Sequence, residues 1–205
     1  MKIKKISIQE IIEFLGDNIL NLYGNTQDVF IDNIADAESV NETTLDWINP
    51  SKTNKQDIAE KSKAKVILVD SSIDYSSELQ TQKKILLVVD NPKFQLAKIG
   101  NHFFIEKITP IIHPTAIIDS QTKIGKDVYI GPYTVIGRSL IGDGCFIDSN
   151  VRIHDDVILG TDCAVKSGAV LGGEGFGYEK DEYGNRFRFP QIGGLIIGNN
   201  VEIGS

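Results

Sequence analysis

Histidine is the residue of this chain best suited to general-base chemistry near neutral pH, because its ordinary pKa lies close to 7. The three histidines are His102, His113 and His154. No neighbouring residue in the sequence places a substrate beside any of them. His154, beside two aspartates, is expected to point outward as a solvated surface residue. The residues alone therefore assign no catalytic base.

The second half of the chain follows a six-residue period. The elements of this repeat must position any reactive side chains there. From Ile112 to the last residue, an aliphatic side chain recurs every sixth position, except for a five-residue step from Ile136 to Ile141 and an interruption between Leu171 and Ile197. A small or apolar residue lies two positions before most of these aliphatics, and glycine often follows them. Side chains two apart on a strand share a face, and glycine permits a turn. The pattern predicts a solenoid of short parallel strands with an inserted loop at 172–194.

Cysteines and aspartates fall at defined places in this repeat. Cys145 and Cys163 are 18 residues apart, which is one coil if a coil holds three repeats, so both are expected to be buried, free and stacked on each other. The aspartates occupy turn positions, where this residue type is favoured, and they lack the spacing of a calcium loop. No metal site is therefore predicted for the following residues: Asp143, Asp148, Asp155, Asp156 and Asp162.

The first half of the chain does not show the six-residue period. Ser7 and Glu10 have the spacing of a capping box and predict a helix over 8–15. Further helices are expected over 57–63 and from about 94 to 104, and the aliphatic runs 66–69 and 85–89 are expected to be buried strands. Strands that alternate with helices predict a small α/β domain over 1–108, followed by the repeats over 109–205.

The composition excludes several classes of protein. The net charge of −7 and the absence of a basic stripe argue against a nucleic-acid partner. No apolar run approaches the length of a transmembrane segment, and the start MKIKKISIQE lacks the apolar core of a signal peptide. We therefore expect a cytoplasmic protein.

Three segments carry a resemblance to a known family: the run 34–37 with Trp47-Ile48-Asn49-Pro50, the joint at 112–118, and the interruption of the repeat, which reads Gly175-Phe176-Gly177-Tyr178, a polar turn, then Pro190-Gln191-Ile192-Gly193. Together they resemble the UDP-3-O-(3-hydroxyacyl)glucosamine N-acyltransferases of lipid A synthesis, over essentially the whole chain. The resemblance implies a left-handed parallel β-helix, which makes a homotrimer, behind a uridine-binding domain.

The activity that this resemblance implies is transfer of a 3-hydroxyacyl chain from acyl carrier protein to the 2-amine of a UDP-linked, O-acylated glucosamine lipid precursor. The donor is the carrier's phosphopantetheine thioester, and no other cofactor is implied. The catalytic histidine of the family follows in a later coil, so the resemblance assigns no catalytic residue to this chain, which is expected to be inactive by itself and truncated before that histidine.

The resemblance also suggests binding residues. Asn49 matches the family's uracil-reading asparagine, while Asp46 and Lys52 stand where the family has an aromatic residue and a tyrosine. Trp47 is one position away and could supply the stacking face, so the uridine site is expected to comprise Asn49, Trp47 and Lys52. The residues expected to meet the acyl carrier lie in the inserted loop: Phe176, Tyr178, Arg186 and Arg188.

Other functions remain open at this stage. One is a sugar-nucleotide acetyltransferase that uses acetyl-CoA, and another is a non-catalytic β-helix fragment. A β-helical zinc enzyme would need three histidines at coil spacing, whereas the repeats contain only His113 and His154. The loop at 172–194 favours the long-chain N-acyltransferase.

Overall fold

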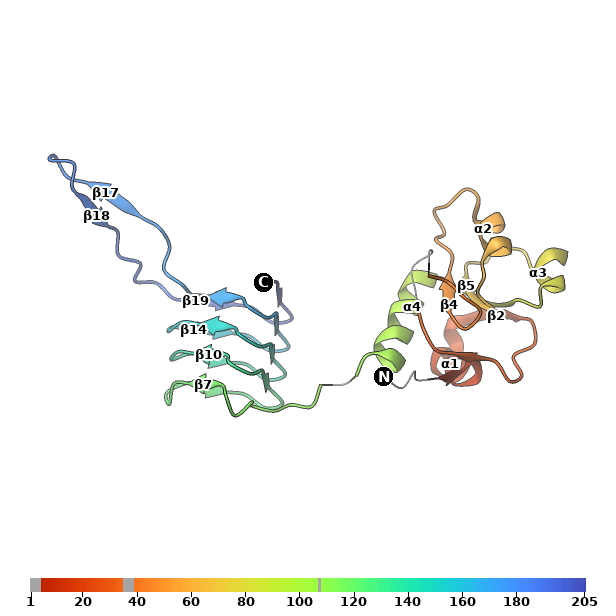
Figure 1. The fold of residues 1–205 in the computed structure, drawn as a ribbon, viewed down its shortest axis with the longest axis horizontal. Coiled ribbons are helices and arrows are strands. Elements are labelled where there is room, and N and C mark those ends of the chain that lie inside the picture. Colours follow the sequence, from red (N-terminus) through yellow and green to blue (C-terminus); the bar gives the residue numbers. More distant parts are fainter. Residues whose placement is uncertain (1–4, 35–38, 107) are drawn as a thin grey trace. The chain divides into compact units, whose positions relative to one another are not determined.

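A computed structural model describes residues 5–34, 39–106 and 108–205. The chain divides into two compact units, Met1–Glu106 and Lys107–Ser205, each of which has its own buried core. Residues 35–37, which belong to the run 34–37, lie outside the described residues. The two units are coloured red to green and green to blue in Figure 1.

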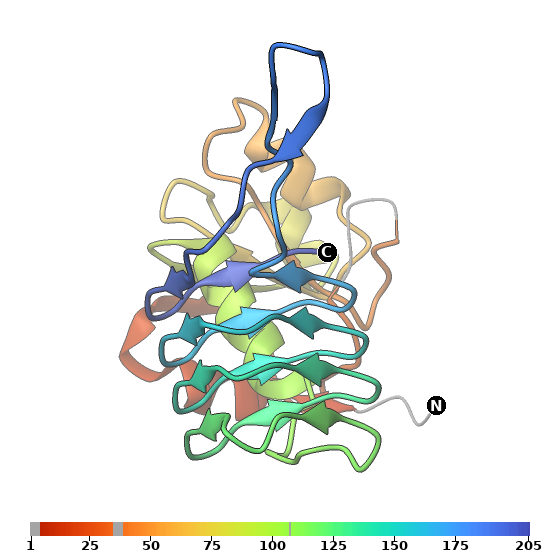
Figure 2. The same ribbon diagram turned by 90° about the vertical axis from the view of Figure 1, so that its left-hand side faces the viewer.

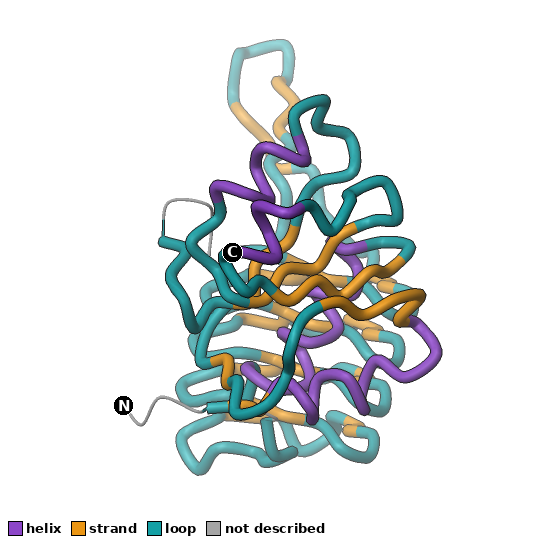
Figure 3. Tube along the Cα trace, turned by 90° about the vertical axis from the view of Figure 1, so that its right-hand side faces the viewer, coloured by secondary structure: helices purple, strands orange, loops and turns teal. Residues whose placement is uncertain are grey.

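The first unit is built on a four-stranded sheet in the order β2-β6-β5-β4. Strands β4 (Leu45–Trp47), β5 (Val66–Val69) and β6 (Ile85–Val89) are parallel, and β2 (Ile19–Tyr23) lies antiparallel to β6 at one edge. Figure 3 shows these strands side by side, with helices around them. Two further strands, β1 (Ile6–Ser7) and β3 (Phe30–Ile31), form a separate antiparallel pair.

Helices cover both faces of this sheet, and β5 and β6 are therefore buried on both sides. Alternate residues such as Val66 and Ile85 pack with α1 and α4, and the intervening residues such as Ile67 and Leu86 pack with α2 and α3. The helical segments are α1 (Ile8–Leu15), α2 (Lys55–Lys61), α3 (Ser77–Thr81), α4 (Pro92–Ile99), a 3₁₀ turn (Gly16–Asn18) and a π-helical turn (Gly100–Phe104).

Some of these elements have the bounds that local sequence signals predict. The capping box of Ser7 and Glu10 is present, and α1 has the predicted bounds. The strand predictions at 66–69 and 85–89 are confirmed. The helix expected at 57–63 instead spans Lys55–Lys61, because the C-cap Ser62, with φ −57° and ψ 137°, has already left the helical conformation.

The second unit is a parallel β-helix with three sheets, each of which takes one strand from every coil (Figure 2). The first sheet contains β7 (Ile117–Ile118), β10 (Val135–Ile136), β13 (Arg152–Ile153) and β16 (Val170–Leu171). The second contains β8 (Lys123–Ile124), β11 (Leu140–Ile141), β14 (Val157–Leu159) and β19 (Leu195–Ile197). The third contains β9 (Tyr129–Ile130), β12 (Phe146–Ile147), β15 (Ala164–Val165) and β20 (Glu202–Ile203).

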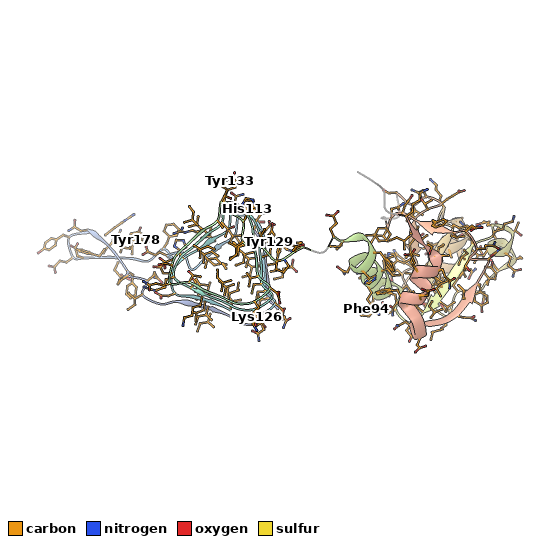
Figure 4. All side chains as sticks on the ribbon, turned by 90° about the horizontal axis from the view of Figure 1, so that it is seen from below. Phe94, His113, Lys126, Tyr129, Tyr133 and Tyr178 are labelled. Carbon is orange, nitrogen blue, oxygen red and sulfur yellow. The ribbon has the colours of Figure 1, made fainter. Side chains whose placement is uncertain are left out.

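The strand register confirms the repeat read from the sequence. Ile141 pairs with Leu159, one coil of 18 residues later, whereas Ile136 pairs with Ile153, because the intervening coil contains the five-residue step. The three sheets of the β-helix enclose a triangular prism. The repeating aliphatic side chains point inward and form the core of this prism. Figure 4 looks along the stack and shows these side chains filling a triangular outline.

The corners of the prism depend on close approach between successive coils. A Cβ added to Gly142 would lie 2.6 Å from the carbonyl carbon and oxygen of Gly160 and 2.8 Å from the nitrogen of Thr161. Only glycine fits at such a position without moving backbone. Aspartates cap other corners, as where Asp155 Oδ1 accepts a hydrogen bond from the Arg138 N–H at 3.0 Å.

The interruption of the repeat forms an antiparallel hairpin between β16 and β19. Its strands are β17 (Tyr178–Lys180) and β18 (Arg186–Arg188), joined by a turn in which Asp181 accepts hydrogen bonds from Tyr183 and Asn185. The bond from the Asn185 side chain lowers the pKa of the Asp181 carboxyl. In the described part of the chain, β17 and β18 form a two-stranded sheet that is separate from the three sheets of the β-helix.

Within the described residues, no helix is both long enough and apolar enough to cross a membrane.

Candidate functional site

The carboxyl ends of β4 and β5 form the first candidate site, since ligands of open α/β sheets usually bind at this edge. Asn49 lies in the exposed turn after β4, where its Oδ1 accepts a hydrogen bond from the Ser51 N–H at 3.0 Å and its carbonyl accepts one from the Lys52 N–H at 3.1 Å. Asn49 thus shapes the turn with its oxygens. In the described part of the chain its amide NH₂ makes no hydrogen bond, so two donors remain available to a ligand.

Trp47 lies near this turn and is half-buried against the core that packs with α1 and α4. It also lines a cavity of about 300 Å³ together with Asp46, Lys61 and Ser62. Neither Asn49 nor Lys52 lines this cavity. The structure therefore places the three predicted uridine residues along one stretch of chain but does not bring them around one cavity.

Asp46 stands where the resemblance places an aromatic residue, and its carboxylate has a structural role. It accepts a hydrogen bond from the Ser62 hydroxyl at 2.6 Å and one from the Trp47 N–H at 2.8 Å. The bond from Ser62 ties β4 to the end of α2. A stacking face for a base can therefore come from Trp47 but not from position 46.

A partly buried ion pair at the same edge was not foreseen. Lys55 Nζ lies 3.1 Å from Asp70 Oδ2, with 23% and 17% of the two side chains exposed. Burial raises the pKa of Asp70, but hydrogen bonds from Ser72 and Lys55 outweigh it, so the pKa is lowered overall. The available signal was the position of Asp70, directly after a buried strand, where α/β sheets commonly place functional side chains.

The hairpin presents the second candidate site. Tyr178 lies opposite Arg188 and Lys180 lies opposite Arg186, so these four side chains share one face of the two-stranded ribbon. Arg188 pairs with Glu174. Phe176 precedes the ribbon and is 96% exposed. The structure thus brings together three of the four predicted loop residues and adds Lys180.

The three histidines lie in different environments. The His102 ring stacks on Phe14 with centroids 4.3 Å apart, and His113 Nδ1 lies 2.8 Å from the hydroxyl of Thr115 at a corner of the prism (Figure 4). His154, expected to be a solvated corner residue, is of intermediate exposure, because Gly173, where the insertion leaves the coil, lies beside its ring.

The cysteine prediction is confirmed. Cys145 and Cys163 are both free, are each 1% exposed and lie on neighbouring coils. Each thiol donates to a glycine carbonyl at 3.0 Å, from Cys145 to Gly160 and from Cys163 to Gly198. Burial raises the pKa of the Cys145 thiol, so it stays protonated and unreactive.

The fold and the comparisons with known proteins together define the class of protein. The family described as bacterial transferase hexapeptide (six repeats) matches residues 138–173, which form the regular coils before the hairpin. The second unit thus contains hexapeptide repeats similar to those of bacterial transferases, and it follows a separate amino-terminal unit.

The particular relatives are more specific. UDP-3-O-acylglucosamine N-acyltransferase 1 of Francisella tularensis subsp. holarctica (strain OSU18) is 34% identical over 97% of this chain and 62% of its own length. UDP-3-O-acylglucosamine N-acyltransferase of Coxiella burnetii (strain Dugway 5J108-111) is 32% identical over 87% of this chain and 56% of its own length. The protein is therefore a homologue of the UDP-3-O-acylglucosamine N-acyltransferases, and it spans less than two thirds of the length of these relatives.

Proposed function

We propose that this chain is part of an N-acyltransferase of lipid A synthesis, which transfers a 3-hydroxyacyl chain from acyl carrier protein to the 2-amine of UDP-3-O-acylglucosamine in the cytoplasm. The observation that carries the proposal is homology to enzymes of this name over 97% of the chain. In this proposal the prism is a left-handed β-helix, and three copies assemble as a homotrimer.

Uridine binding is proposed at the carboxyl edge of the first unit. The free amide of Asn49 can donate to a uracil carbonyl, and Trp47 offers an aromatic face next to a cavity. Lys52 follows Asn49 in the same exposed turn, where its ammonium can reach the diphosphate. This arrangement replaces the stacking residues that the family places at positions 46 and 52.

The basic face of the hairpin supports docking of the acyl carrier protein. Lys180 and Arg186 are directly opposite each other, and like charges in this position repel. Among the described residues, neither side chain makes an ion pair. An acidic carrier would relieve the repulsion, while the exposed rings of Phe176 and Tyr178 would contribute apolar contact.

An apolar stripe on the outside of the second sheet supports trimer assembly. Leu140, Ile158 and Ile196 stack in register there and are 43%, 40% and 76% exposed. Contiguous exposed apolar residues on a regular sheet are typical of protein interfaces. Sedimentation equilibrium should give a trimer that Ile158→Asp weakens, and a monomer for the wild-type chain would contradict this part of the proposal.

No histidine of this chain is proposed as the base that takes the proton of the attacking amine. Loss of a general base costs about 100-fold or more in rate. In the complete enzyme, replacement of His102, His113 or His154 by asparagine should therefore leave the rate of acyl transfer within a few-fold. A loss of that size in one variant would identify the base and overturn this assignment.

Two binding measurements test the substrate assignments. The chain has a single tryptophan, so Trp47 fluorescence reports directly on the uridine site. Titration with UDP should change this fluorescence saturably, and Asn49→Ala should lower the affinity for UDP.

The affinity for an acyl carrier protein should fall about tenfold in the variant Lys180→Glu/Arg186→Glu. In high salt this loss of affinity should be smaller. Lys126→Glu, at a corner away from the hairpin, is the matched control (Figure 4). A carrier that binds all three proteins equally would contradict the docking site.

A further inference from the structure

A lysine is buried in the first unit, where the ion pairs of the described residues do not include it. Lys84 directly precedes β6 and is 7% exposed, and its Nζ donates to the carbonyls of Ser62 at 2.5 Å and Ala64 at 2.6 Å. Within the described ranges, no carboxylate lies within 4.0 Å of this ammonium. Buried ammonium groups are almost always paired, because loss of water around an unpaired charge is costly.

Two more lysines surround this group. Lys65 precedes β5 in the same way, next to Lys84 across the amino edge of the sheet, and Lys63 lies two residues before it. All three line one cavity of about 450 Å³. Burial lowers the pKa of Lys84 and the charge of Lys65 lowers it further, while the carboxylates of Asp46 and Glu42 act in the opposite direction without cancelling the effect. The three lysines outnumber the two carboxylates of the same cavity, and among the described residues none of the three makes an ion pair.

The remaining walls of this amino-edge cavity limit what can occupy it. Asp28 and Glu42 contribute carboxylates, while Phe30 and Gln82 contribute an apolar ring and an amide. The volume lies in the range of small-molecule sites and exceeds that of an inorganic ion. A fitting ligand has a multiply charged anionic group on the lysine side and hydroxyl groups that can donate to the carboxylates.

We propose that the amino-edge cavity binds a small phosphate ester of a polyhydroxy compound, with its phosphate against Lys84 and Lys65. The third N–H of the Lys84 ammonium, which the two carbonyls leave free, would donate to a phosphate oxygen. This site is distinct from the proposed uridine site, because β4, β5 and β6 are parallel and Asn49 lies beyond their opposite ends. It is also independent of acyl transfer.

A purely structural role for Lys84 makes a different prediction. Its two carbonyl bonds close the connection between α2 and β5, and a lysine near a helix C-terminus also interacts favourably with the helix dipole. If that were its whole role, Lys84→Met would alter stability, but the wild-type protein would not respond to phosphate esters.

Titration of the ¹⁵N-labelled chain with glucose 6-phosphate tests the proposal, with sodium chloride at matched ionic strength as reference. We expect saturable shifts of the Lys65 and Lys84 amides, with affinity at least tenfold weaker in Lys84→Met and in Lys65→Met. Lys83→Met removes the same charge from an exposed neighbour that does not line the cavity, and should bind like the wild type. If Lys84→Met does not fold, Lys65→Met still decides. No saturable shift, or equal affinity in the wild type and the folded cavity variants, would overturn the proposal.

Discussion

Substitution of Gly142 by alanine tests how closely the coils of the β-helix are stacked. The added Cβ would lie 2.6 Å from backbone atoms of Gly160, which belongs to the next coil and cannot rotate away. Overpacking of this kind typically costs about 1–3 kcal/mol, and a cost of about 2 kcal/mol corresponds to about a 30-fold larger opening equilibrium. The matched control is Gly198→Ala, at the same position of a repeat, where an added Cβ meets nothing within 4 Å.

The two cysteines allow this opening to be measured in the second unit alone. They are the only cysteines of the chain, and each is 1% exposed, so a thiol reagent reaches them only when the coils open. When opening is in rapid equilibrium, the labelling rate follows the open population. We expect labelling about 30-fold faster in Gly142→Ala and unchanged or slower in Gly198→Ala. Labelling of Gly142→Ala at the wild-type rate would refute the stacking argument.

Two further predictions concern the first unit. Ser7→Ala should destabilise it by about 1 kcal/mol in urea unfolding, because the capping box of α1 loses the hydrogen bond that the Glu10 N–H donates to the Ser7 hydroxyl. A change in the unfolding midpoint that lies within error would contradict that role. The pKa of Lys84 is lower in the folded state than its ordinary value of about 10.4. At a pH between the folded and the unfolded pKa, the unfolded chain therefore binds more protons than the folded chain. The free energy of unfolding should rise with pH through this window and be lower at any pH below it. Lys84→Met should flatten this rise in a pH series of urea unfolding, whereas Lys83→Met should keep it.

Features encoded by short segments could be predicted from the sequence. The prism follows from a six-residue period because each repeat makes the same strand and the same turn, and the stacking of Cys145 on Cys163 follows from their spacing of three repeats. The bounds of α1 follow from the local bonds between Ser7 and Glu10.

Features that depend on distant parts of the chain could not be predicted. The edge strand β2 was missed because Leu20 and Leu22 remain exposed, and it is held by pairing with β6 rather than by an alternating pattern. Lys84 resembles any charged residue before a strand, since its burial depends on the carbonyls of Ser62 and Ala64, about 20 residues away in sequence. Likewise, Lys180 joins the basic face only through the register of the hairpin.

All the irregularities of the β-helix occur at a single edge of the prism, where the chain passes from the first sheet to the second. The shortened step lies there, between β10 and β11, and the hairpin emerges there, between β16 and β19 (Figure 2). The strands on either side of this edge still pair with those of the neighbouring coils, both where the step is shortened and where the hairpin is inserted. A scaffold of this kind can therefore accommodate an inserted hairpin by lengthening one corner, without altering the core that supports it.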